Sequence, residues 1–136
     1  TGKCGVKVFA NAELREVDFN AFDVLLLPGG PAVMELRKNQ VVIRMIKSFH
    51  EQNRLIAAIC AAPLLLRDAD LIDGKRITAH DSTIDELPGS TGERVVYDGE
   101  FLTSRGAGTA MDFGLELVKI LCGKAVADEV GRAVMV

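Results

Sequence analysis

The cysteine at position 60 is the residue of this sequence best placed to do chemistry. It follows the apolar run 54–59 and precedes the stretch 61–66, a pattern that predicts a buried strand turning sharply into a helix. A side chain at such a turn stands above the carboxyl edge of a sheet, where the first amides of the helix face whatever is bound there. Small residues on both sides of Cys60 suit a tight turn. The position makes Cys60 a candidate thiolate nucleophile, and the alternative is a free cysteine that packs as a small apolar residue.

Two further loops are expected at the same edge of the sheet. Residues 23–27 form a continuous apolar run, typical of a strand covered on both faces in a parallel sheet, and the run ends in the glycine loop 28–30. Another short strand is expected at 75–79, and His80 follows it directly. Ligands of parallel sheets bind at the carboxyl ends of the strands, so we expect these loops to meet near Cys60. The alternatives are a plain turn for the glycines and a structural loop histidine for His80.

Helices and strands alternate along the rest of the chain. Apolar residues recur at helical spacing over 39–52, where Asn39 is a suitable N-cap. The other expected elements are a strand at 6–9, a helix from the Cys60 turn to about residue 68, a hairpin of strands 95–97 and 101–103 around Asp98-Gly99, a long helix between Thr109 and Gly123, and a helix at 125–133. This alternation predicts an α/β fold with a mainly parallel sheet.

Composition narrows the classes of function. A chain of 136 residues is one domain of ordinary size, and its net charge of −3 without a basic stripe gives no reason to expect nucleic acid as a partner. No apolar run approaches the roughly 20 residues of a membrane span. The three cysteines are far apart and odd in number, which predicts no disulfide framework, no metal site and a reducing, cytoplasmic location. We expect Cys4 to be exposed, Cys122 to be a packing residue, and neither to be catalytic.

Four motifs spread along the chain resemble those of the ThiJ/PfpI superfamily. They are Leu-Pro-Gly-Gly at 27–30, Ala-Ala-Ile-Cys-Ala-Ala-Pro at 57–63, Thr-Ala-His at 78–80, and Leu-Thr-Ser-Arg-Gly-Ala-Gly-Thr at 102–109. They are most similar to the branch of the Parkinson's-disease-associated protein deglycase and bacterial YajL. This resemblance implies a flavodoxin-like fold, with a parallel sheet, helices on both faces and a nucleophile elbow, and it implies a homodimer.

The resemblance also implies roles for single residues. Cys60 matches the family's reactive, easily oxidised cysteine, and His80 matches the histidine beside it. Gly30 and Ala61 match positions whose backbone amides form an oxyanion pocket, and Gly29 lies in the same glycine loop. A pocket wall is expected from Arg105, Gly106 and Ala107, with Ala107 in place of the family's proline. The alternative for this last segment is a strand end followed by a helix start.

The expected activity is that of a cysteine-dependent glyoxalase or protein deglycase. Such an enzyme acts on 2-oxoaldehydes such as methylglyoxal, or on their protein adducts, and no metal or organic cofactor is implied. The alternative from another class is a redox-sensing chaperone or stress-response protein in which Cys60 is oxidised without turnover. A cysteine peptidase or amidase is disfavoured because Ala61, rather than a histidine, follows Cys60.

The resemblance begins only at the family's third strand. We therefore expect residues 1–136 to form a single domain that lacks the family's N-terminal strand–helix–strand segment. That segment carries the glutamate that hydrogen-bonds the reactive cysteine, and Asp68, Asp70 and Asp81 are not obvious replacements. We expect the segment to be supplied by a separate polypeptide or lost, and the chain not to fold alone from Thr1, because unpaired strand edges recruit other strands.

Overall fold

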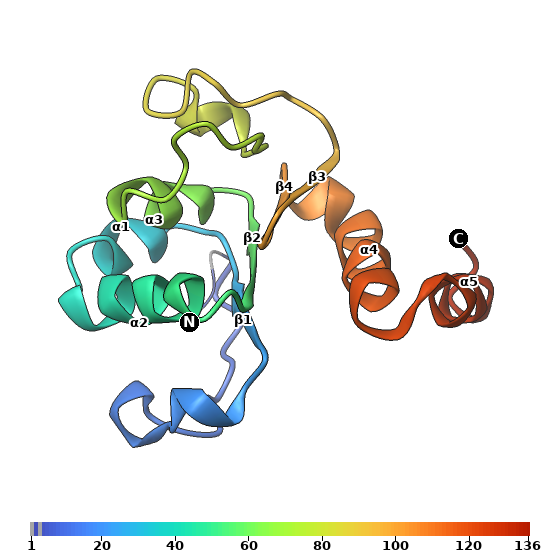
Figure 1. Ribbon diagram of the computed structural model, residues 1–136, viewed down its shortest axis with the longest axis horizontal. Coiled ribbons are helices and arrows are strands. Elements are labelled where there is room, and N and C mark those ends of the chain that lie inside the picture. The colour runs from blue at the N-terminus through green and yellow to red at the C-terminus, as the bar shows by residue number, and fades with distance from the viewer. Residues whose placement is uncertain (1, 3) are drawn as a thin grey trace.

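A four-stranded sheet forms the centre of the protein (Figure 1) in a computed structural model that describes residue 2 and residues 4–136. Its strands lie in the order β1 (Val24–Leu27), β2 (Leu55–Ile59), β4 (Phe101–Ser104) and β3 (Val95–Asp98). The first three are parallel, and β3 pairs with β4 as an antiparallel hairpin. The predicted hairpin is confirmed, with Gly99 and Glu100 as its two loop residues and Gly99 in the left-handed region at φ 61°.

Helices cover both faces of this sheet. One face carries α1 (Val33–Leu36), α2 (Gln40–Glu51) and α3 (Pro63–Asp68), while α4 (Ala110–Cys122) lies on the other and α5 (Lys124–Ala133) packs on α4 (Figure 1). Short 3₁₀ turns occupy Leu14–Glu16, Phe19–Ala21, Asp81–Thr83 and Ala107–Thr109. The predicted α/β fold with a mainly parallel sheet and helices on both faces is confirmed.

The two faces are built from alternating residues of the strands. Along β2, Ile56 and Ala58 join the core beneath α2 and α3, whereas Ala57 joins the cluster beneath α4. This follows from the two-residue period of a strand, which sends successive side chains to opposite faces. The start of α2 is also as predicted, because the Asn39 side chain accepts a hydrogen bond from the backbone N–H of Val41 at 2.9 Å.

Two predicted strands are absent from the part of the chain that the structure describes. Residues 6–9 form no strand, and their apolar side chains are exposed, reaching 91% at Phe9. Residues 75–79 join no ladder, because β4 already pairs with β2 on one edge and with β3 on the other. The segment is held instead by single bonds, among them Thr78 N–H to the Thr103 hydroxyl at 3.0 Å and Thr91 N–H to the Ile77 carbonyl at 2.9 Å.

The strand at 24–27 is less covered than its apolar run predicts. Leu27 is buried, but Leu26 is 48% exposed. Leu26 is in register with Ala57 of β2, so it points to the face of the sheet that carries α4. Because α4 packs on β2, β3 and β4, this face of β1 is left open within residues 4–136.

Two predictions about α4 are corrected by the structure, one at each end of the helix. Thr109 precedes the helix as predicted, but its hydroxyl pairs with the Ser104 hydroxyl at 2.6 Å and with the Gly106 carbonyl at 3.0 Å instead of capping α4. Gly123 ends the helix at φ 88°. The prediction that Cys122 packs inside is wrong, since it is exposed at the last position of α4.

Candidate active site

Cys60 occupies the sharp turn between β2 and α3. Its φ of 66° lies in the left-handed region, which is rare for a residue with a side chain. Two backbone bonds hold this conformation: the Cys60 N–H donates to the Ser104 carbonyl at 2.8 Å, and the Cys60 carbonyl accepts from the His80 N–H at 2.9 Å. The helix then begins at Pro63, which suits the first position of a helix because its missing N–H is not needed there. The partly exposed thiol is thus presented at the carboxyl end of the sheet.

Gly29 lies directly against Cys60. A Cβ at position 29 would stand 2.5 Å from the Cys60 Cβ, 2.7 Å from the Ile59 carbonyl oxygen and 3.1 Å from the Cys60 Sγ. No side chain fits in that space. Gly30 follows with φ 105°, a conformation that favours glycine.

The backbone amides of this region are free to act as donors. Within residues 4–136, no oxygen accepts a hydrogen bond from the N–H of Gly30 or of Ala61. Ala61 directly follows Cys60, and Gly30 follows the glycine that lies against it. These are the two amides that the sequence predicts as oxyanion donors.

His80 lies beside Cys60 and is anchored through its own ring. The Nδ1 atom accepts a hydrogen bond from the Ser82 N–H at 3.1 Å and lies 2.9 Å from the Ser82 hydroxyl. Because a backbone N–H can only donate, Nδ1 is the acceptor, and the proton of the neutral ring sits on Nε2. Ser82 was not singled out from the sequence, although a Ser two residues after a His in a loop is a typical local hydrogen-bond partner.

Gly106 brings the thiol and the imidazole to one place. A Cβ built on Gly106 would lie 3.3 Å from the Cδ2 of His80 and 4.0 Å from the Sγ of Cys60, so both side chains face this buried glycine. Its neighbour Arg105 places Nη2 3.3 Å from both carboxylate oxygens of Asp81. Ala107 begins the exposed turn that follows.

An open pocket of about 380 Å³ adjoins this arrangement. Its lining includes the predicted wall and its neighbours: His80, Asp81, Arg105, Gly106, Ala107 and Thr109. Cys60 and the glycine loop 28–30 do not line this pocket. The predicted segments are joined instead by the contacts of Cys60 with Gly29 and Gly106 and by its backbone bond to His80, although the strand expected before His80 is absent.

The carboxylates considered as partners of Cys60 are engaged elsewhere. Asp81 faces Arg105, Asp68 pairs with Arg37 at 2.6 Å, and Asp70 lies 3.5 Å from Lys47. In the described part of the chain, no group of three or more His, Cys, Asp or Glu side chains is arranged to hold a metal ion. Nor does that part contain a helix long and apolar enough to cross a membrane.

Known proteins share this sequence pattern. The sequence profile of the DJ-1/PfpI family matches residues 1–120. An Arabidopsis thaliana protein, DJ-1 homolog A, is 35% identical over 96% of the chain, but the chain spans only 35% of that relative's length. A glutathione-independent glyoxalase from Caenorhabditis elegans is 31% identical, over 89% of the chain and 68% of the relative. A deglycase from Thermococcus kodakarensis is 33% identical, over 89% of the chain and 75% of the relative.

Solved structures agree with the observed fold. DJ-1beta of Drosophila melanogaster superposes with a TM-score of 0.80 at 36% identity, over 85% of this chain and 64% of that one. DJ-1 of Schizosaccharomyces pombe gives a TM-score of 0.84 at 29% identity, over 94% of this chain and 73% of that one.

Proposed function

The chain belongs to the DJ-1/PfpI family, and on that premise we propose that it is a cysteine-dependent glyoxalase or protein deglycase. The observation that carries the proposal is the strained Cys60 turn, whose thiol lies against Gly29 and, like the edge of the His80 ring, faces Gly106. Relatives named as a glyoxalase and a deglycase support the substrate class, which is a 2-oxoaldehyde such as methylglyoxal or its adduct on a protein.

The proposed reaction begins with addition of the Cys60 thiolate to the aldehyde carbon of methylglyoxal. The S–C bond forms as the carbonyl π bond breaks, and negative charge develops on oxygen, where the N–H groups of Gly30 and Ala61 stabilise it. His80 donates its Nε2 proton to this oxygen and receives from solvent the proton that the Cys60 thiol released on ionising, which gives a hemithioacetal and leaves the ring neutral.

An internal redox step then completes the proposed cycle. The proton on the former aldehyde carbon moves to the neighbouring carbon by way of an enediol, with His80 carrying protons between the oxygens. The aldehyde carbon is oxidised to a thioester as the ketone is reduced to an alcohol. Water cleaves the thioester, releases lactate and restores the thiol. Atoms and electrons balance without an external oxidant, so the proposal needs no cofactor.

The direct test is lactate production from methylglyoxal by the intact protein and by Cys60→Ser. We expect Cys60→Ser to lose turnover and His80→Asn to lose about 100-fold or more of kcat. The matched control is the double variant Cys4→Ser/Cys122→Ser, which removes two exposed thiols and should keep full activity. Full activity in Cys60→Ser would rule out the proposal.

The partial exposure of Cys60 also favours a second candidate function, in which the thiol is oxidised as a sensor. Mass spectrometry after mild peroxide treatment tests it, with the exposed Cys4 and Cys122 as internal controls. Preferential sulfinate at Cys60 is expected. Oxidation spread evenly over the three cysteines would contradict a site that makes the Cys60 thiol selectively oxidisable.

We further propose that the protein is a cytoplasmic homodimer. The three cysteines form no disulfide in the described structure, which suits a reducing compartment. Light scattering coupled to size-exclusion chromatography tests the dimer, and a monomeric mass at micromolar concentration would contradict it.

A further inference from the structure

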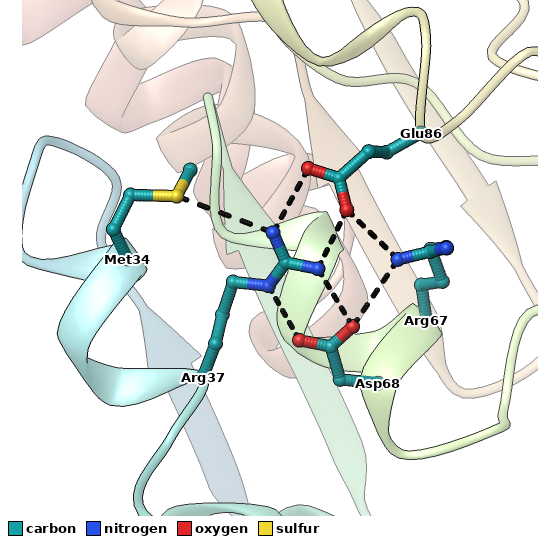
Figure 2. Close-up of polar contacts among 5 residues, drawn as sticks. All are labelled: Met34, Arg37, Arg67, Asp68 and Glu86. Carbon is teal, nitrogen blue, oxygen red and sulfur yellow. Dashed lines mark hydrogen bonds and ion pairs between the residues drawn. The ribbon is translucent and has the colours of Figure 1, made fainter.

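A cluster of charged side chains joins three separate segments of the chain (Figure 2). The guanidinium of Arg37 binds the Asp68 carboxylate through Nε at 2.6 Å and Nη2 at 3.0 Å. It also binds the Glu86 carboxylate through Nη1 at 2.9 Å and Nη2 at 2.6 Å. Arg67 reaches the same Glu86 oxygen as Nη2 does, at 2.8 Å. Arg37 is the centre of this cluster because it alone binds both carboxylates through paired bonds.

The Arg37 side chain is held tightly enough to act as a structural tie. Its side chain is only 19% exposed, and that of Asp68 is 20% exposed. Bidentate arginine–carboxylate pairs fix orientation as well as distance. The same hydrogen bonds from Arg37 are the main reason that the pKa of Glu86 lies below its ordinary value of 4.5.

Each segment that meets at Arg37 also carries a residue of the candidate site. Arg37 ends α1, which follows the glycine loop 28–30, and Asp68 ends α3, which follows Cys60. Glu86 lies in the irregular segment that follows His80. The cluster therefore ties together, a few residues downstream, the three chain segments that supply the loop, the thiol and the imidazole.

His80 depends on this tie more than Cys60 does. Cys60 leaves a central strand and enters a helix whose Leu64, Leu65 and Leu66 are fully buried. His80 instead lies between a segment that joins no ladder and a single 3₁₀ turn. A short path of bonds links the ring's segment to Glu86: the Thr83 hydroxyl donates to the His80 carbonyl at 2.7 Å, and the Glu86 N–H donates to the Thr83 carbonyl at 3.0 Å.

We propose that Arg37 is a positioning residue, which fixes His80 relative to Cys60 by holding Glu86 against the end of α3. The inference rests on the proposed roles of Cys60 as nucleophile and His80 as proton donor. Arg37 itself makes no contact with the thiol in the described structure, so it acts only through the segments that it joins. Loss of the tie leaves Glu86 and the His80 turn free to shift.

The test is a double-mutant cycle on thiol reactivity, which does not require turnover. Alkylation of Cys60 by iodoacetamide is followed by mass spectrometry between pH 5 and 9, with the exposed Cys4 and Cys122 as references in the same molecule. We expect Arg37→Met to lower the rate of Cys60 alkylation about 10-fold and to change how that rate depends on pH. The reason is that small misplacements of catalytic groups have large effects on rate. In a His80→Asn background the same change should have less than about a twofold effect, since coupled residues are not additive.

Two further variants separate positioning from stability. Glu86→Gln keeps the Arg37–Asp68 pair and weakens only the contact between Arg37 and the segment that follows His80. It should therefore also lower the rate of Cys60 alkylation, and it can be measured even if Arg37→Met fails to fold. Arg54→Met is the matched control, because Arg54 also ties chain segments, with bonds to the carbonyls of Phe19 and Phe22 at 2.9 and 2.8 Å. It should leave the relative Cys60 rate within about twofold.

The outcomes distinguish this inference from the proposed function. An equal effect of Arg37→Met with and without His80, or no effect on Cys60 at all, would overturn the positioning role. A wild-type protein that turns over no methylglyoxal but gives the non-additive alkylation cycle would refute the glyoxalase proposal and still support the role of Arg37.

Discussion

Replacing Gly29 with alanine tests the contact on which the candidate site depends most directly. The added methyl carbon would stand 2.5 Å from the Cys60 Cβ and 2.7 Å from the Ile59 carbonyl oxygen. Carbon atoms normally approach no closer than about 3.5 Å, so the overlap is about 1 Å, and both neighbours are fixed by the backbone of the turn. Overpacking of this kind costs about 1–3 kcal/mol. A shift of Cys60 on the order of 1 Å is the expected structural response.

Two measurements on Gly29→Ala follow from this overlap. The melting temperature should fall on the order of 5 °C, and Cys60 alkylation should change while that of Cys4 does not. Gly89→Ala is the matched control, because a Cβ there meets no atom within 4 Å and the residue does not lie in the positive-φ region. A Gly29→Ala protein with the melting temperature and the Cys60 rate of the wild type would refute the close packing described here.

Two further changes probe the interactions around the site. Because Arg37 lowers the pKa of Glu86 in the folded protein, the stability that Glu86 contributes is fully present above pH 4.5 and is lost as the pH falls through the lowered value. Urea unfolding should therefore show Glu86→Gln less stable than wild type at pH 7, with the difference shrinking as the pH falls below 4.5, and a constant difference would contradict the shift. Thr103→Val removes the buried acceptor of the Thr78 N–H and should cost about 1–3 kcal/mol; the exposed Thr91→Val serves as control, and equal losses in both would contradict the role of Thr103.

The parts of the fold that follow from local sequence were predictable. The apolar run before Cys60, the small residues around it and Pro63 together define a strand, a tight turn and a helix, and the structure has all three. The spacing of apolar residues and the Asn39 cap likewise give α2 to within a residue at each end. In these segments the local preference and the tertiary environment agree.

The two strand predictions that were wrong depend on the topology of the sheet, which local sequence does not reveal. A strand needs a free edge to pair with, and residues 75–79 meet a sheet in which β3 already occupies the outer edge of β4. The hairpin itself was predicted, but its place in the strand order was not. Residues 6–9 alternate as a strand should and have no ladder partner in residues 4–136. Sequence pattern reports which residues can form a strand, whereas pairing depends on topology.

The Arg37 cluster lay beyond sequence reasoning because its partners are 31 and 49 positions away from Arg37. Nothing near Arg37, Asp68 or Glu86 distinguishes them from the many charged residues that face solvent. The fold brings the three charged residues together downstream of three loops that converge at the carboxyl edge of the sheet. The relative positions of these loops must be fixed if the site is to keep its geometry. One backbone bond, from the His80 N–H to the Cys60 carbonyl, joins these two loops directly. On the proposal above, the Arg37 cluster joins them a second time, outside the site and through side chains. For this reason we expect the geometry of His80 to be more sensitive to Arg37 than to substitutions that are closer in sequence but contact only one of the three segments.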